Sequence, residues 1–167
     1  MSNIDKQTEL IKAIEGDLVL QVKRLLADGV DINATNENDL PLLIVAIKSN
    51  ASKEMVELLL DKGADIDWKT KEGVSLLDEV VEKNRVDLAK LFIDRGIDPC
   101  KTSRKSGMTA LMLAACFDYV EMMELLLERG ANLYAIDKNG MSALDYARKL
   151  RCKRAQKWLE DKMANPF

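Results

Sequence analysis

The 167-residue sequence contains no histidine, and it holds only three cysteines, three prolines and eight glycines. Without histidine, the usual general base for a serine or cysteine nucleophile is missing, and a mixed cysteine–histidine zinc site cannot form. The scarcity of proline and glycine argues against a disordered or low-complexity chain. Cys100, Cys116 and Cys152 are odd in number and widely spaced. This pattern predicts free, reduced thiols rather than a disulfide framework.

Signal-peptide, membrane-spanning and phosphate-binding patterns are also lacking. Within the first fifteen residues, charged side chains interrupt any stretch long enough for the apolar part of a signal peptide: Asp5, Lys6, Glu9 and Lys12. No run approaches the roughly 20 apolar residues that cross a membrane, so we expect a cytoplasmic protein. The glycine-rich phosphate loops and the G-x-S-x-G nucleophile motif do not occur. We therefore expect no cofactor, no bound metal, no small-molecule substrate and no catalytic activity.

Charge is present in ordinary amount but is unevenly distributed. The formal net charge is −3. Residues 100–167 carry 12 Lys/Arg against 8 Asp/Glu, whereas the first 99 residues carry 13 against 20. Such an asymmetry can orient a partner, but it is too mild to indicate a nucleic-acid-binding protein unaided.

A repeat of about 33 residues runs through the chain. Leucine-rich segments such as "VELLLDKG" and "MMELLLERG" each end on a glycine, and these glycines are spaced 34, 33 and 34 residues apart. A polar stretch and a second apolar segment follow each of them. The apolar residues recur at i, i+3 and i+4, which predicts paired amphipathic helices that must stack to bury their apolar faces. The glycines are Gly29, Gly63, Gly96 and Gly130.

These motifs resemble the ankyrin-repeat family. "TALMLA" (residues 109–114) and "SALDYA" (142–147) are similar to the family's T-P-L-H-x-A, and Gly63-Ala64-Asp65 matches its link after the second helix. The resemblance implies an all-α solenoid of about five helix-turn-helix repeats with extended hairpin loops. It looks like a small stand-alone, bacterial-style member with one domain, 1–167, whose first and last units act as caps. The units are approximately 1–32, 33–66, 67–99, 100–133 and 134–167.

Two kinds of residue occupy the position of the family's histidine. Asp78 and Asp145 each follow a serine by three residues, Ser75 and Ser142, which predicts capping boxes at two helix starts. A catalytic role for these aspartates has little support, because no partner group accompanies them. The remaining equivalents are apolar and extend the helix stripe: Ile11, Ile44 and Met112.

One apolar residue recurs in each loop, directly after the loop glycine or its equivalent Asp39. The family binds other proteins through its loop tips and first helices, so the resemblance implies that these residues contact a partner. They would then form an adaptable hydrophobic strip. The alternative, that they tuck under the neighbouring loop, is equally open. They are Leu40, Val74, Met108 and Met141.

Further candidates for partner contact are two aromatic residues and one basic loop. Trp68 occupies a link position where the family is usually small, and Phe117 lies at a turn between helices. Aromatic residues at such places are natural interface anchors, although local packing is the alternative. The loop "KTSRKSG" has an extra residue and carries Lys101, Arg104 and Lys105. It is either a binding loop or simply solvated.

The sequence thus predicts a non-catalytic protein–protein interaction scaffold that uses its concave face and loop tips. The alternative is a salt-sensitive binder of an acidic surface, nucleic acid or anionic lipid, through the basic C-terminal unit. We expect the partner to be another protein, and nucleic acid is the less favoured possibility.

Overall fold

The computed structural model describes residues 3–165, which form ten α-helices and no strands, only isolated β-bridges. This confirms the prediction of an all-α repeat fold. The chain divides into two compact units, Met1–Asp67 and Trp68–Phe167. The division falls close to the predicted boundary between the second and third repeats. None of the helices in residues 3–165 is long and apolar enough to span a bilayer.

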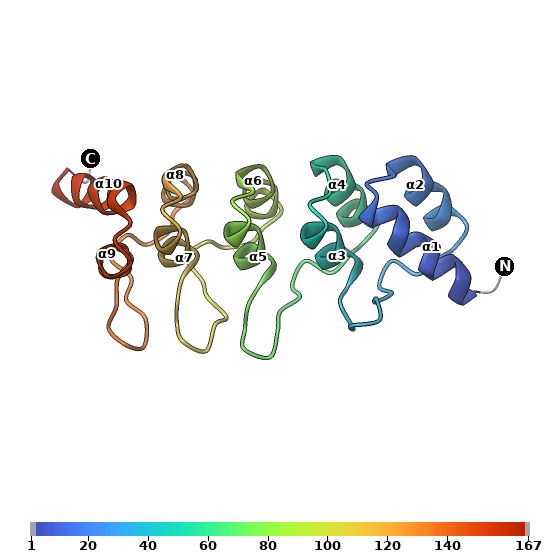
Figure 1. The fold of residues 1–167 in the computed structure, drawn as a ribbon, viewed down its shortest axis with the longest axis horizontal. Helices are drawn as coiled ribbons and strands as arrows, with labels where there is room; N and C mark the ends of the chain where they lie inside the picture. The colour runs from blue at the N-terminus through green and yellow to red at the C-terminus, as the bar shows by residue number, and fades with distance from the viewer. Residues whose placement is uncertain (1–2, 166–167) are drawn as a thin grey trace. The chain divides into compact units, whose positions relative to one another are not determined.

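The first unit is built from two helix pairs, each joined by a tight turn (Figure 1). The first helices of the two pairs, α1 and α3, pack against each other, and so do the second helices, α2 and α4. A hairpin loop separates the pairs. The helices are α1 (Asn3–Glu15), α2 (Val19–Ala27), α3 (Leu42–Lys48) and α4 (Lys53–Asp61).

The second unit contains three further helix pairs. Its first helices form one layer in which α7 lies between α5 and α9, and its second helices form another in which α8 lies between α6 and α10. Figure 1 shows the hairpin loops that lead into α5, α7 and α9 projecting from the same side of this unit. The helices are α5 (Leu76–Glu82), α6 (Val86–Asp94), α7 (Ala110–Cys116), α8 (Val120–Glu128), α9 (Ala143–Lys149) and α10 (Lys153–Ala164).

The core of each unit consists of the apolar stripes that the sequence predicts. In α7, every residue from Ala110 to Ala115 is buried, because helices α5, α8 and α9 surround it. Phe92 of α6 is fully buried. Burying one large aliphatic or aromatic side chain stabilises the fold by roughly 1.5–3 kcal/mol, so stacking supplies most of the stability of these short helices.

The glycine that ends each second helix has the left-handed backbone conformation expected of it. Gly63, for example, has a φ of +93°, and its N–H donates to the carbonyl of Leu60. The next N–H, of Ala64, reaches back to the carbonyl of Leu59. These bonds satisfy the last carbonyl groups of α4 and turn the chain out of the helix.

Capping at the first helices confirms the interpretation of the aspartates. The Ser75 N–H donates to Asp78 Oδ2 at 2.9 Å, and the Asp78 N–H donates to Ser75 Oγ at 3.3 Å. Ser142 and Asp145 repeat this arrangement at 2.8 and 3.2 Å. Asp78 is nearly buried, and its carboxylate is engaged in capping.

Met112 adds a contact that the sequence did not suggest. Its side chain is 1% exposed, as expected for the apolar stripe, but its Sδ also lies 3.4 Å from the Thr109 N–H. Thr109 Oγ1 in return accepts from the Met112 N–H at 3.3 Å. The thioether, a weak acceptor, thus stands in for the carboxylate of a capping box.

Candidate partner-binding loops and groove

The three hairpin loops of the second unit are closed at their necks. Lys69 pairs with Ser75 in the first of them, and Ile136 pairs with Ser142 in the last. The middle loop has the extra residue, and there Thr102 Oγ1 donates to the carbonyl of Met108 at 2.6 Å. A side chain thus takes over the closing contact that backbone pairing makes in the flanking loops.

The tips of these hairpins are tied to one another by backbone hydrogen bonds. The Lys105 N–H donates to the carbonyl of Glu72 at 3.1 Å, and the Lys138 N–H donates to the carbonyl of Ser106 at 2.9 Å. In both bonds the donor stands two residues before its own loop glycine, and the acceptor stands directly before the glycine of the preceding loop. Ser103 Oγ also donates to the carbonyl of Gly73 at 2.6 Å. The loop tips therefore form a rigid, preorganised edge.

Gly73 shows how closely the first two of these loops approach. Its φ is +84°, and a Cβ at this position would lie 1.8 Å from the carbonyl oxygen of Ser103. Both the backbone conformation and the contact require glycine. The loop-tip edge thus depends on the absence of a side chain at this residue.

Asp137 anchors the last hairpin to α9. Its carboxylate accepts from the N–H groups of Asn139 (2.8 Å) and Met141 (2.9 Å) and from Tyr146 Oη (2.5 Å). The Tyr146 hydroxyl is the main reason that the pKa of Asp137 lies below its usual value. The same bond raises the pKa of Tyr146 to about 12. At neutral pH the hydroxyl therefore stays protonated and holds the hairpin in place.

Arg104 differs from the other cations of the basic loop, because its side chain turns inward. Its Nη2 lies 3.3 Å from Glu82 Oε1, and its Nε lies 3.3 Å from Asp78 Oδ2, at an angle outside hydrogen-bond geometry. The side chain is only 16% exposed, whereas that of Lys101 is 85% exposed. The loop is thus less basic at its surface than the sequence suggests: Lys101 Nζ lies 3.8 Å from Asp98 Oδ2, and the exposed Lys105 carries the remaining charge.

The apolar loop residues of the second unit are half-buried. Val74, Met108, Met141 and Trp68 each keep part of their surface accessible. Each of them therefore presents some apolar area to solvent.

Phe117 is 46% exposed at the turn between α7 and α8, and it stacks on Tyr119 with ring centroids 5.4 Å apart. One exposed apolar residue in the last hairpin, Ile136, is 65% exposed and was missed by the sequence analysis, and Tyr134 in the same hairpin is 59% exposed. Aligning the loops could have found Ile136, because the equivalent position of an earlier hairpin holds a charged residue, Lys69, and is therefore expected to be exposed.

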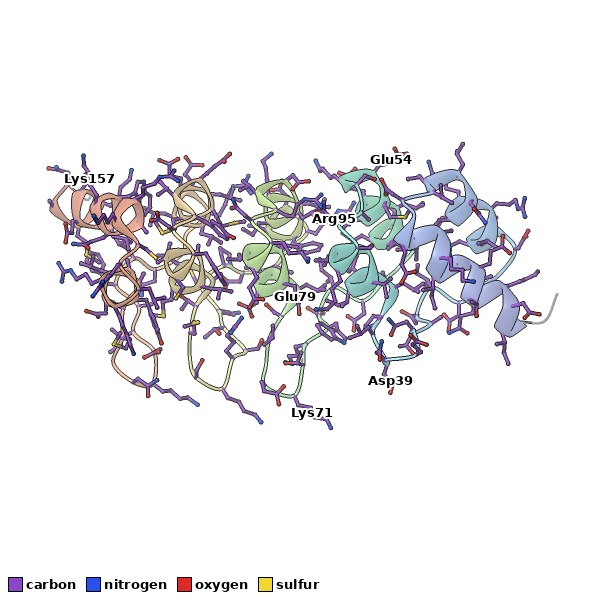
Figure 2. The ribbon with its side chains drawn as sticks, viewed as in Figure 1. Asp39, Glu54, Lys71, Glu79, Arg95 and Lys157 are labelled. Carbon is purple, nitrogen blue, oxygen red and sulfur yellow. The ribbon has the colours of Figure 1, made fainter. Side chains whose placement is uncertain are left out.

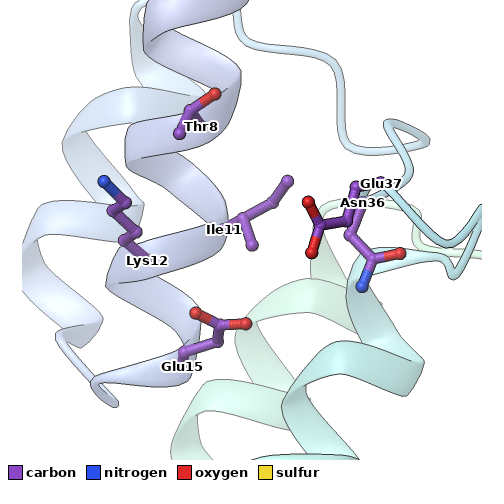
Figure 3. A pocket seen from close by; sticks show the side chains of 6 residues that line it. All are labelled: Thr8, Ile11, Lys12, Glu15, Asn36 and Glu37. Atoms are coloured by element: carbon purple, nitrogen blue, oxygen red, sulfur yellow. The ribbon is translucent and has the colours of Figure 1, made fainter.

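The first unit has a groove between its first helices and its hairpin loop. A pocket of about 230 Å³ is lined by α1 and by Asn36 and Glu37 of the loop, and Figure 3 shows Ile11 on its helical side. A second pocket, of about 340 Å³, shares Glu15 and Asn36 with the first and is also lined by Leu40. Ile11, at the histidine position, thus lines a groove, and Leu40 contributes to the same surface.

The cysteines form no disulfide among the residues that the structure describes. Burial raises the pKa of the Cys116 thiol to about 11, so it stays protonated at neutral pH. Cys152 Sγ donates to the carbonyl of Cys116 at 3.3 Å. Within residues 3–165, no three side chains of the metal-binding types gather closely enough to hold a metal ion.

Comparison with known proteins identifies the repeat. A family model of ankyrin repeats in three copies matches residues 10–103 and again residues 77–166. The chain belongs to the ankyrin-repeat family. Ankyrin repeats are in general protein–protein interaction modules, which agrees with the exposed apolar loop residues described above.

Similar proteins come from a virus, a bacterium and an animal. An ankyrin repeat protein of Acanthamoeba polyphaga mimivirus is 31% identical over 120 residues, 70% of each chain. An ankyrin repeat-containing protein of Treponema pallidum is 33% identical over 65% of this chain and 36% of that protein. An E3 ubiquitin-protein ligase of Caenorhabditis elegans is 27% identical over 139 residues, which make up only 5% of the ligase. The matched region thus makes up most of the viral relative, about a third of the bacterial protein and a small part of the ligase.

Proposed function

We propose that this ankyrin-repeat chain is a non-catalytic scaffold that binds a partner protein through its hairpin loops and the faces of its first helices. The observation that supports this most directly is the linked edge of the second unit. There, backbone bonds between hairpins hold the half-buried Met108 and Met141 in place. A preorganised surface loses little conformational entropy on binding, which favours affinity.

The first unit offers a second contact surface for the same function. Leu40 and Ile11 supply apolar area in its groove, and Glu15 and Glu37 supply charge. In the second unit, Trp68 and Phe117 extend the apolar area available to a partner. Lys101 and Lys105 provide a cationic rim, and Arg104 shapes the surface through its ion pairs.

A cytoplasmic location is part of this proposal, and the three free thiols favour a reducing compartment. We also propose that residues 1–167 behave as one domain. A single unfolding transition, seen alike by tryptophan fluorescence and by far-ultraviolet circular dichroism, would support this. Two separate transitions would refute it.

Partner capture followed by measurement on the purified partner tests the function. The wild-type chain is used as bait in source lysate, captured proteins are identified by mass spectrometry, and the dissociation constant is measured for each. Met108→Ser with Met141→Ser should weaken binding at least tenfold, because apolar anchors at interface centres contribute most of the affinity. Trp68→Ala with Phe117→Ala should act in the same direction.

Leu20→Ala is the matched control for these variants. Leu20 is 81% exposed on α2, a second helix away from the hairpin side of its unit. The control should bind as the wild type does. If Leu20→Ala abolishes capture while both double variants bind normally, the loop surface is not the binding surface.

The alternative, an acidic-surface binder, is favoured by the exposed Lys153, Arg154 and Lys157 on α10. If these side chains neutralise phosphate groups, the affinity should fall steeply as the salt concentration rises. A dissociation constant for single-stranded DNA or anionic vesicles that does not change between low and moderate salt rejects this alternative.

A further inference from the structure

The three hairpin tips of the second unit place a lysine at the same position. Lys71, Lys105 and Lys138 each stand two residues before the loop glycine, and all three are exposed. Figure 2 shows Lys71 at the tip of its hairpin, pointing away from the helices. We call these three residues the lysine row. The corresponding residue of the first unit's hairpin is Glu37, so the row is particular to the second unit.

The backbone holds the lysine row in register. The same bonds that join the tips, from Lys105 to Glu72 and from Lys138 to Ser106, use the N–H groups of two members of the row. Their side chains are left to solvent. Within residues 3–165, none of the three ammonium groups forms an ion pair, in contrast to Arg104 directly beside them. The row therefore presents three unpaired positive charges on a fixed frame.

Charges near the row are mostly positive. Lys69 and Lys101 lie on the same hairpins and are exposed, and Lys101 pairs with Asp98 at 3.8 Å. The exposed Glu72 is an opposing charge at one tip, while the equivalent residues of the other two tips, Ser106 and Asn139, are neutral. Asp137 is buried and held by Tyr146. The field above the tips is thus positive, and a partner that crosses the loops meets it directly.

We propose that the lysine row binds an extended, acidic segment of a partner protein, which lies across the three hairpins. This deepens the proposed function and rests on it. Stacked helices lie about 8–10 Å apart, so the tips that they carry recur at a similar spacing. A chain in the extended polyproline II conformation rises about 3.1 Å per residue with three residues per turn, so every third side chain points the same way. A carboxylate at every third residue therefore matches the row.

The half-buried apolar residues next to the row favour a polypeptide over nucleic acid or a membrane. Val74, Met108 and Met141 each lie three residues after a lysine of the row. Their exposed area suits apolar side chains that lie between the carboxylates of an extended segment.

The test uses a fluorescein-labelled peptide, EVTEVTEVTE, and a peptide of the same composition with contiguous acids, EEEEVVVTTT. Binding to the full chain is measured by fluorescence anisotropy at low ionic strength, where screening is weak. Exposed ion pairs contribute about 0.5 kcal/mol each, so changing all three lysines to glutamine should weaken binding of the spaced peptide roughly tenfold. The wild type should also prefer the spaced peptide to the contiguous one.

The control variant removes the same amount of charge elsewhere in the chain. Lys23, Lys53 and Lys62 are exposed on or directly after the second helices α2 and α4 of the first unit. Changing these three to glutamine should alter binding less than twofold. Circular dichroism on both triple variants checks that the fold is retained.

Several results overturn the inference. It fails if the wild type does not bind the spaced peptide, if both peptides bind equally, or if both triple variants lose equal affinity. Tighter binding of a ten-nucleotide oligothymidylate, or of vesicles with one-fifth phosphatidylserine, through the same lysines assigns the row to phosphate. Self-association of the wild type that the lysine-row variant abolishes assigns it to a second copy. A captured protein whose affinity ignores the lysine row refutes the inference but leaves the proposed function standing.

Discussion

Replacing Gly73 by alanine tests whether the contact between hairpins stabilises the second unit. An alanine at a φ of +84° is strained, since the left-handed conformation costs about 1–2 kcal/mol for a residue with a Cβ. The lower conformational entropy of the unfolded alanine chain offsets about 0.4–1 kcal/mol of this cost. The new Cβ would also lie 1.8 Å from the carbonyl oxygen of Ser103, so the loops must separate.

Separation breaks two hydrogen bonds between these loops. They run from Ser103 Oγ to the Gly73 carbonyl and from the Lys105 N–H to the Glu72 carbonyl. Each contributes about 1 kcal/mol. With the residual strain, we expect Gly73→Ala to lower the free energy of unfolding by about 3 kcal/mol. For a urea m-value of about 1–3 kcal/mol/M, the midpoint should fall by roughly 1–3 M.

Gly140→Ala is the matched control, because Gly140 has a φ of +73° but nothing within 4 Å of the added Cβ. It should cost only about 1 kcal/mol, from strain alone. Tryptophan fluorescence reports on this unit, since both tryptophans, Trp68 and Trp158, belong to it. Equal midpoints for the two alanine variants would refute the idea that the loop contact stabilises the unit.

Three further changes can be followed by the same urea titration. Met112→Leu should destabilise by about 1 kcal/mol, since the buried Thr109 N–H loses its acceptor, and an unchanged midpoint for this variant would contradict the capping role of sulfur. Met112→Lys should destabilise by considerably more, because it buries an unpaired charge. Hydrogen bonds from its capping serine lower the pKa of Asp145 from its usual 3.8. Its stabilising contribution is therefore present above pH 3.8 and is lost as pH falls through the lower folded-state pKa, so the deficit of Asp145→Asn seen at pH 7 should shrink toward pH 3. Arg104→Ala should cost about 1–3 kcal/mol by leaving two carboxylates unpaired, whereas Lys105→Ala should cost almost nothing.

The sequence predicted the repeat, the helix pairs and the capping aspartates because each depends on local chemistry that recurs at a fixed interval. Ser75 and Asp78 meet wherever a helix starts between them, so their spacing was sufficient evidence. The inward turn of Arg104 depends instead on Asp78 and Glu82, which lie 22 or more residues away in the chain. No local pattern identifies such a partner.

The candidate site was predictable in position but not in detail. Loop alignment placed Met108 and Met141 correctly at the same point of successive hairpins, but the degree of their burial depends on how closely neighbouring loops approach. The same alignment contained the lysine row, yet its significance became clear only from the bonds of Lys105 and Lys138 to the preceding loops. The sequence predicted only a packing role for Met112, because no characteristic residue spacing indicates a thioether that accepts a hydrogen bond.

Because the bonds between hairpin tips use backbone groups, the side chains at the tips can determine what the loop surface binds without affecting the stability of the fold. At Lys105 and Lys138 the backbone carries the structural bond, while the side chain is in solvent and forms no contact that the unit needs. The first unit shows the same position filled by Glu37, of opposite charge. One residue per repeat can thus be exchanged freely. The binding specificity of the edge could therefore be changed by substituting these exposed residues one at a time, at almost no cost in stability.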